Sequence, residues 1–302
     1  MSDLSEFKLL ELTPHDGESR LHAVLGAGLK KVTGKSRLEP VLPHWRPEFF
    51  ELEKSSIYQQ LKEPAQDAIL RRCSLNVLHE AFFIEESGMA YASKMALMAE
   101  TREERMLYNL FAADEATHFH WVQSAMGHHA EEVVPNQFHR LLEGIIREGH
   151  RESLVFIIQV ILEGWGLSHY RSLHRHCQQP EFRDILERIL RDEARHHGSG
   201  VVLCRERGLP DVARQQVVDT MRAFLDMVRA GPQGVLDSIS QECGGLSKAD
   251  RLQTLKELGA EDHSLIRLKH LRELMLQEGF ESIVEELEAC DSFVPYAPEL
   301  CV

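Results

Sequence analysis

Four long stretches of the chain repeat apolar residues at the three- and four-residue spacing that places them on one face of an α-helix. In the first stretch this face includes Leu78, Phe82, Glu85, Met89 and Ala92, so that one carboxylate lies among apolar residues. The pattern predicts long helices over residues 65–99, 101–127, 152–177 and 180–208. Thr101 with Glu104 suits a capping box at the start of the second helix, and Pro180 suits the first turn of the fourth.

Shorter helical patterns connect and follow these four. Pro135 opens a linking helix that ends near Gly149. The last third of the chain predicts further helices over residues 212–230, 248–258, 264–278 and 281–289. No sustained alternation of apolar and polar residues, as in a half-buried strand, occurs anywhere. The fold class expected is therefore all-α, with the C-terminal helices serving packing, a lid or an oligomer contact.

The first 64 residues are less regular. Pro40, Pro43 and Pro47 interrupt this part of the chain, which favours an extended arm held to the body by Trp45, Phe49 and Phe50. The basic cluster at 28–37 (GLKKVTGKSR) is interpreted as a solvated loop, with a docking patch for a partner as the alternative. We therefore divide the chain into an arm (1–64), a helical bundle (65–208) and a C-terminal helical extension (209–302) that we expect to belong to the same domain.

Composition narrows the class of protein. The 302 residues are 27% charged and 43% hydrophobic, with a formal net charge of −14, as in a globular protein that does not bind nucleic acid or anionic membranes through a basic surface. No apolar run is long enough to span a bilayer, and the N-terminus has no signal-peptide pattern. The six cysteines contain no Cys-x-x-Cys pair, which excludes a zinc ribbon or a rubredoxin-type iron site and indicates reduced, mostly buried thiols in a cytoplasmic protein.

Two five-residue stretches carry the candidate chemistry: residues 114–118 (DEATH) and 192–196 (DEARH). In each, a Glu and a His stand three residues apart and share a helix face, as two ligands of one metal ion would. Glu-x-x-His alone is a weak signal, because both residue types are common. The spacing strengthens it: the second stretch follows the first by 78 residues, and 30 residues before each motif Glu stands another Glu, Glu85 or Glu163.

The same shift superposes Gly88 on Gly166 and apolar neighbours on one another. It also selects Glu85 over Glu80 and Glu86, which have no counterpart in the second half. Two helices that each supply a lone Glu and two that each supply Glu-x-x-His are the arrangement that builds a dinuclear carboxylate site in a four-helix bundle. The predicted metal ligands are Glu85, Glu115, His118, Glu163, Glu193 and His196. Four carboxylates and two imidazoles suit two iron ions, with manganese possible in one or both sites.

Asp114 and Asp192 precede the motif Glu residues. We expect them to accept the spare N–H of a ligating histidine, while an exposed position on the helix surface is the alternative. The pair His128 and His129 is interpreted as a turn, because no third ligand stands nearby in the sequence.

The predicted ligands and their order resemble those of the ferritin-like diiron-carboxylate superfamily, over about residues 65–208. The stretch 192–196 is similar to the second iron motif of the acyl-carrier-protein desaturases and the bacterial multicomponent hydroxylases. The resemblance implies that all six predicted ligands bind iron, with Glu115 and Glu193 as the bridging carboxylates.

Three positions depart from named subgroups. Val122 replaces the Tyr of the radical-generating ribonucleotide reductase subunit, and Ile189 replaces the third His of the arylamine N-oxygenases. Gly166 and Leu167 stand where hydroxylases and desaturases typically have a Thr, with Ser168 the nearest hydroxyl. The motifs therefore indicate the superfamily and no single subgroup.

The resemblance and the site together favour an oxygenase that activates O2 to hydroxylate, N-oxygenate or desaturate a small organic substrate. A separate reductase is expected as electron donor, because the sequence has no flavin or iron–sulfur motif, and a homodimer is possible. A ferroxidase or peroxidase of the ferritin and rubrerythrin type, or a helical scaffold that keeps a metal only for stability, are the alternatives.

The two glycines bear on where a substrate binds. Gly88 and Gly166 each stand three residues after a predicted ligand, within helices where glycine costs roughly 1 kcal/mol relative to alanine. Close packing of two helix backbones would explain them. Alternatively, they open a substrate pocket beside the metals, whose predicted residues are Phe82, Gly88, Met89, Phe111, Trp165, Gly166 and Tyr170.

Overall fold

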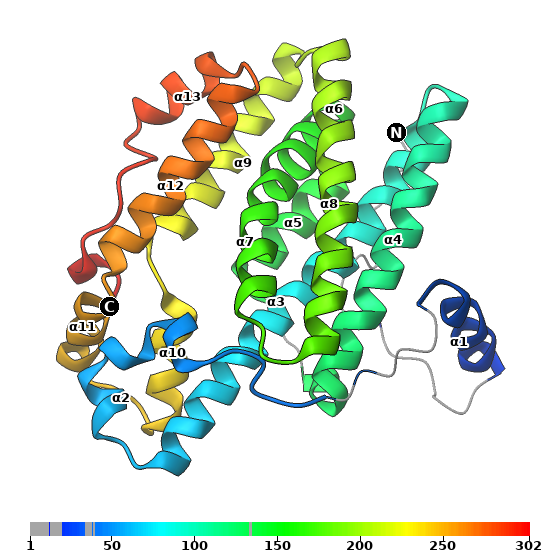
Figure 1. Ribbon diagram of the computed structural model, residues 1–302. Helices are drawn as coiled ribbons and strands as arrows, with labels where there is room; N and C mark the ends of the chain where they lie inside the picture. Colours follow the sequence, from blue (N-terminus) through cyan, green and yellow to red (C-terminus); the bar gives the residue numbers. More distant parts are fainter. Residues whose placement is uncertain (1–11, 13–19, 34–37, 39, 133–134) are drawn as a thin grey trace.

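The computed structural model describes residues 12, 20–33, 38, 40–132 and 135–302, and Figure 1 shows how their helices are arranged. Among these residues all regular elements are helical and no β-strand occurs. The all-α fold expected from the apolar spacing is confirmed. No helix in the described ranges is both long and apolar enough to cross a membrane.

Four long helical segments form the bundle at the centre of Figure 1. Two of them are α3 (Glu63–Met98) and α4 (Arg102–Met126), which pack along each other. The other two are a composite third segment, which ends in α7 (Glu163–His176), and α8 (Pro180–Arg207), and these also pack along each other. Contacts between α4 and α8 join the two pairs. Each predicted bundle helix agrees with the observed bounds to within about two residues, which is the usual uncertainty of helix ends.

The start of α4 forms only half of the predicted capping box. Thr101 Oγ1 accepts the backbone N–H of Glu104 at 3.1 Å. The Glu104 carboxylate does not return to Thr101; it accepts the backbone N–H of Glu100 at 3.0 Å and binds Arg151 and Arg207. This buried carboxylate therefore joins three bundle helices instead of capping its own.

The third bundle segment is not a continuous α-helix. It consists of α6 (Arg151–Leu154), a π-helical segment η4 (Val155–Leu162) and α7. Gln159, fully buried in η4, accepts hydrogen bonds from Tyr91 Oη at 2.6 Å and Tyr108 Oη at 2.9 Å and donates to the carbonyl of His196 at 3.1 Å. Wide π turns of this kind frequently occur at functional sites, and this one ends where Glu163 begins α7.

Helix α5 (Gln137–Glu148) connects the two pairs of bundle helices. It begins two residues after Pro135, because Asn136 is its N-cap and forms a complete capping box with His139. The preceding turn η3 (Gly127–Glu132) contains His128 and His129, whose rings contact each other at a tilt of 40° with centroids 3.9 Å apart.

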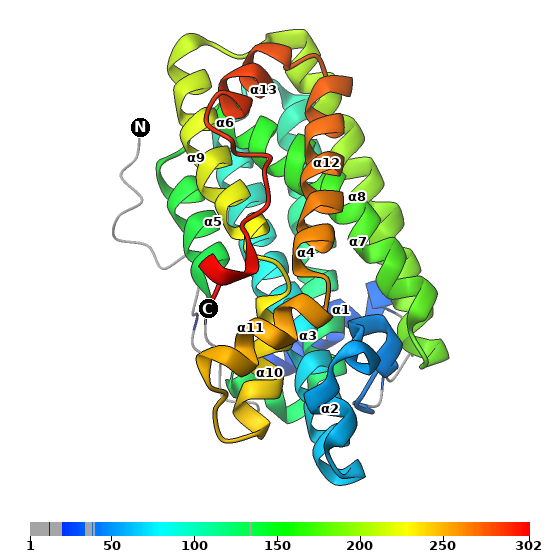
Figure 2. The ribbon, with the colours of Figure 1, turned by 90° about the vertical axis from the view of Figure 1, so that its left-hand side faces the viewer.

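The C-terminal extension forms a layer over one side of the bundle. Its elements are α9 (Asp211–Arg229), α10 (Gln233–Glu242), α11 (Lys248–Glu257), α12 (Ala260–Gln277) and α13 (Glu281–Glu288). Figure 2 shows α9 and α12 side by side, with α13 across one end. Helix α12 also contacts α7 and η4, so that the extension reaches the segment that carries Glu163.

Two expectations for the extension were incomplete. Helix α10 was not predicted, because it follows Pro232 and contains Gly234 and two serines, which weaken its helical signal. Helix α12 begins four residues before its predicted start, at Ala260, directly after Gly259 in a left-handed conformation.

The N-terminal arm is more helical than expected. Helix α1 (Arg20–Thr33) includes the first part of the basic cluster, which is therefore not a loop there; residues 34–37 of the cluster lie outside the described residues. Short helical turns η1 (Pro47–Phe50), η2 (Leu52–Lys54) and α2 (Ser56–Gln60) replace the predicted extended chain. Trp45 is 1% exposed and donates its indole N–H to the carbonyl of Leu173 at 3.0 Å, which ties the arm to α7.

Candidate metal centre

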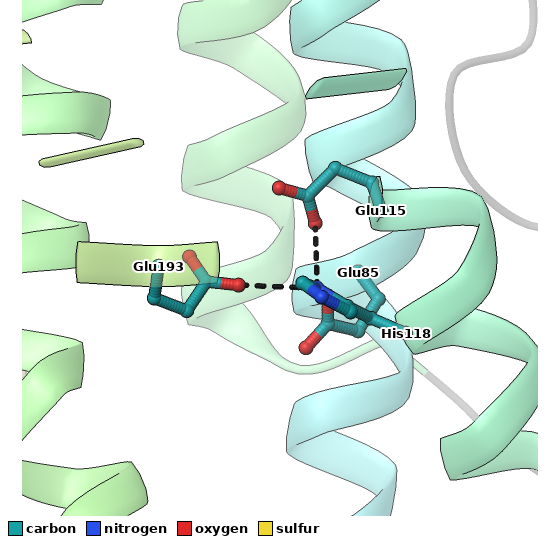
Figure 3. A group of neighbouring side chains, drawn as sticks. All are labelled: Glu85, Glu115, His118 and Glu193. Atoms are coloured by element: carbon teal, nitrogen blue, oxygen red, sulfur yellow. Dashed lines mark ion pairs between the residues drawn. The ribbon is translucent and has the colours of Figure 1, made fainter. Parts of the chain in front are cut away.

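The six predicted ligands come together inside the bundle. Two groups of side chains each place one possible ligand atom per residue within 4.8 Å of one another. The first group is Glu85, Glu115, His118 and Glu193, shown in Figure 3, and the second is Glu115, Glu163, Glu193 and His196. The two groups share two residues, Glu115 and Glu193, which are the carboxylates expected to bridge two metal ions.

The contacts around His118 define the first group. Its Nδ1 lies 3.3 Å from Glu85 Oε2, 3.2 Å from Glu193 Oε1 and 3.8 Å from Glu115 Oε2. In Figure 3 the three carboxylates, from α3, α4 and α8, converge on this ring. One side of the imidazole is therefore directed at three carboxylate groups from three helices.

The contacts around His196 repeat this arrangement in the second group. Its Nδ1 lies 3.1 Å from Glu115 Oε1 and 3.5 Å from Glu193 Oε2. Glu115 and Glu193 thus each place one oxygen near each histidine. A carboxylate held in this way can bind two metal ions at once, one through each oxygen.

The outward nitrogens of the two histidines contact aspartates from the opposite half of the repeat. His118 Nε2 lies 3.2 Å from Asp192 Oδ2, and His196 Nε2 lies 3.3 Å from Asp114 Oδ2. Arg195 Nη2 donates to both aspartates, at 2.7 Å to Asp114 and 3.0 Å to Asp192. The aspartates therefore orient both rings with Nδ1 inward, which is the role of a carboxylate behind a ligating histidine.

Burial and the shared charges shift the pKa values of the group strongly. Burial raises the pKa of Glu85 to about 8 and that of Glu163 well above its usual range. Burial would lower the pKa of His196, but its contacts with Asp114, Glu115 and Glu193 outweigh this and raise it to about 12. The pKa of His118 is likewise raised well above its usual value by its four carboxylate neighbours, against the effect of burial. The carboxylates therefore strongly favour positively charged groups at this point.

Several buried ligand atoms of the cluster complete no hydrogen bond. They are Glu85 Oε2, His118 Nδ1, Glu163 Oε2 and His196 Nδ1. Buried polar atoms are nearly always satisfied in folded proteins, and a site for an ion is one recognised reason for an exception. Oxygen and imidazole donors without thiolate suit iron or manganese, so the residues present fit a pair of such ions.

A cavity of about 140 Å³ adjoins the cluster. Glu115, Glu163 and Glu193 line it, together with Gly88, Trp165, Gly166 and Tyr170 of the predicted pocket. The other three predicted pocket residues do not line it. Phe82 packs against Phe83 and Phe119, Phe111 is buried against the ring of His196 with centroids 3.9 Å apart, and Met89 is half-buried elsewhere on α3. Helical spacing gave the correct general face of α3 and α4 but not the direction of each side chain.

The two glycines of the repeat serve different purposes. A Cβ on Gly88 would lie 2.6 Å from Glu115 Oε2, whereas a Cβ on Gly166 would meet nothing within 4 Å. Gly88 therefore makes room for a carboxylate of the cluster, and Gly166 faces open space in the cavity. Neither glycine marks the close packing of two helix backbones.

The sequence did not predict the contacts that three residues make near the cluster. Tyr170 donates a hydrogen bond to Glu85 Oε1, Arg195 joins the two aspartates, and Gln159 fixes the π turn before Glu163. The signal for Gln159 was present, because it is the one polar residue in the apolar run Leu154–Leu162. Partners on other helices cannot be inferred from spacing within one helix.

Comparison with known proteins assigns one domain. Residues 72–201 match the family model described as a ferritin-like domain, a range that begins within α3 and ends within α8 and includes all six clustered residues. No curated protein and no solved structure matches the chain. The resemblance to the ferritin-like superfamily is confirmed: the protein has a ferritin-like domain, whose four helices surround a buried carboxylate and histidine cluster that could bind metal.

Proposed function

We propose that this protein is a diiron oxygenase that oxidises a small organic substrate with O2. The observation that carries the proposal is the cavity lined by Glu115, Glu163 and Glu193, because it gives a small molecule direct access to the cluster. Glu85, Glu115 and His118 would hold one iron ion, with Glu163, Glu193 and His196 at the other and the two shared carboxylates between them. When bound, the ions would supply the O2 chemistry that the side chains alone cannot perform.

The overall balance requires an external reductant. One oxygen atom of O2 is inserted into a substrate C–H bond to give C–OH, and the other leaves as water after taking up two electrons and two protons. A separate reductase supplies the electrons in this proposal. The proposal also places the protein in the cytoplasm, in line with its six free cysteines. Only Cys73 and Cys177 are buried, so the expectation of mostly buried thiols is wrong.

The protein's own residues prepare this site. Asp114 and Asp192 hold His196 and His118 with Nδ1 inward, and Arg195 fixes both aspartates. Tyr170 orients Glu85 through its hydroxyl and also lines the cavity. Apolar side chains make up most of the remaining cavity wall, so they exclude water around the reacting C–H bond.

Metal analysis followed by O2 uptake tests the proposal. Purified protein should hold two iron ions per chain, and the chemically reduced protein should consume O2 repeatedly while reductant lasts. A ferroxidase would instead consume O2 in proportion to added Fe(II) and accumulate ferric iron. A scaffold would hold the metal without consuming O2, and either result would refute the oxygenase assignment.

A further inference from the structure

The cavity beside the cluster meets a larger outer cleft of about 850 Å³. Five residues line both spaces and therefore stand where the two meet: Glu80, Phe138, Trp165, His169 and Arg267. They come from α3, α5, α7 and α12. We call these five residues the neck. A molecule entering from the outer cleft must pass the neck before it reaches the clustered carboxylates.

The neck contains one cation and one anion that are not paired with each other. Arg267 and Glu80 are both half-buried, and the hydrogen bonds and ion pairs of the described residues include neither the guanidinium nor the carboxylate. Burial lowers the pKa of Arg267, and Glu80 offsets this only in part. An arginine remains protonated all the same, so Arg267 contributes a poorly solvated positive charge to the neck.

His169 adds no second positive charge at neutral pH. Burial lowers its pKa, which favours the neutral imidazole. Phe138 and Trp165 complete the neck with aromatic surface. The neck thus offers a single cation and a single anion, beside one neutral imidazole and two aromatic side chains.

The inner cavity limits what can lie beyond the neck. An engineered apolar protein cavity of about 150 Å³ binds benzene, so the inner space of about 140 Å³ holds a group of similar size. Its wall beyond the neck is largely apolar and includes Ala81, Ile84, Leu142, Ile146, Ile158 and Leu162. A phenyl ring or a short alkyl group fits this space.

We infer that the substrate is an α-amino acid with an apolar side chain, whose carboxylate binds Arg267, whose ammonium binds Glu80 and whose side chain enters the inner cavity. A compound with a carboxylate alone would satisfy Arg267 but bring like charges together at Glu80. An amine alone would leave Arg267 unpaired. Only a zwitterionic head group can pair with both Arg267 and Glu80. Binding in this way leaves the apolar part of the amino acid, with its C–H bonds, nearest the cluster.

The reaction in this inference rests on the proposed function and would be the same insertion of oxygen into a C–H bond. Binding of the amino acid can be tested without that reaction. Calorimetry on the full-length protein loaded with Mn(II) compares two amino acids, L-phenylalanine and L-norleucine, with 3-phenylpropanoate, which lacks the ammonium, and 2-phenylethylamine, which lacks the carboxylate. We expect at least one amino acid to bind at least about 10-fold more tightly than either single-charge compound, as the loss of one charged hydrogen-bonded contact implies.

Two substitutions assign the charges. Arg267→Gln should weaken the amino acid about 10-fold or more and leave 2-phenylethylamine unchanged, whereas Glu80→Gln should weaken the amino acid and leave 3-phenylpropanoate unchanged. Lys269→Gln, an exposed change on the same helix, is the matched control and should leave every affinity unchanged. If a neck variant fails to fold, the comparison of ligands on the unsubstituted protein still tests whether the substrate is an amino acid.

The inference is overturned if neither amino acid binds to protein that holds two metal ions, if 3-phenylpropanoate or 2-phenylethylamine binds as tightly, or if folded Arg267→Gln binds the amino acid unchanged. Its failure is distinct from failure of the proposed function. Amino-acid binding without O2 consumption would refute the oxygenase alone, and O2 consumption without amino-acid binding would refute only the assignment of the substrate.

Discussion

Substitution of Gly88 by alanine should disrupt metal binding, because this glycine makes room for Glu115. The added Cβ would lie 2.6 Å from Glu115 Oε2, so the oxygen must retreat by about 0.8 Å to reach the 3.4 Å of ordinary contact. Metal–ligand distances normally lie within about 0.2 Å of their standard values, so a displacement of this size takes the oxygen out of its position in the cluster. Since Glu115 belongs to both ligand groups, we expect Gly88→Ala to weaken the binding of both ions by at least about 100-fold.

The effect of Gly88→Ala on the metal-free fold should be small by comparison. Overpacking costs about 1–3 kcal/mol, while replacing glycine within a helix recovers about 1 kcal/mol, so the free energy of unfolding should fall by about 0–2 kcal/mol. Gly166→Ala is the matched control, because its Cβ meets nothing within 4 Å. It should stabilise the protein by about 0.5–1 kcal/mol and keep both ions.

Anaerobic titration with Mn(II), followed by electron paramagnetic resonance, measures the two binding events, and thermal unfolding of the metal-free proteins measures stability. The reasoning is refuted if Gly88→Ala binds two ions with the affinity of the unsubstituted protein. It also fails if Gly166→Ala loses metal, because the two glycines would then not differ in the way their surroundings indicate.

Four further predictions test the cluster, the cavity and the arm. Glu193→Ala should lose at least one ion and lower the melting temperature of metal-loaded protein, and it should also lower that of metal-free protein, because it removes a carboxylate that contacts both histidines, as calorimetry with and without metal would reveal. Gly166→Leu should fold, keep both metals and consume O2 after reduction but lose substrate-dependent turnover; loss of metal instead would show that the residue serves packing. Arg195→Gln should leave stability within about 1 kcal/mol, because Arg195 is half exposed, and weaken metal binding roughly 10-fold or more by freeing the two aspartates, as metal titration would show. Burial lowers the pKa of His44 to about 4, below its unfolded value of 6.5, so the unfolded state binds the extra proton and stability falls as pH drops from about 6.5 to 4; urea unfolding should show a shallower decline for His44→Gln.

The sequence predicted which six side chains cluster, because the chain repeats their pattern. Glu85 and Glu163 occupy equivalent places 78 residues apart, and that equivalence distinguished Glu85 from its neighbour Glu86, which is also buried. Helical periodicity then placed all six side chains inside one bundle. The binding of metal by these residues stays a prediction that the titrations above would test.

Contacts between distant helices were beyond the reach of periodicity. Arg267 on α12 lines the same cavity as Glu163 on α7, but no local pattern links a residue of the last third of the sequence to the repeat. Phe82 and Phe111 share helix faces with predicted ligands, yet Phe82 packs against Phe119 and Phe111 against the ring of His196. Which side chains fill or line a cavity depends on rotamers and on neighbouring helices, and neither is encoded in the spacing of one helix.

The crossed aspartate contacts bear on how such a site can arise. The first helix pair supplies His118, but the aspartate that orients this ring is Asp192 of the second pair, and the reverse holds for His196 and Asp114. One α-hairpin alone therefore contains a histidine and an aspartate that cannot serve each other. Two copies of a single hairpin, facing each other across a twofold axis, would restore every contact. The arrangement is what duplication and fusion of a self-associating hairpin would leave behind, with Arg195 as an asymmetric addition, because the equivalent position in the first half is Thr117.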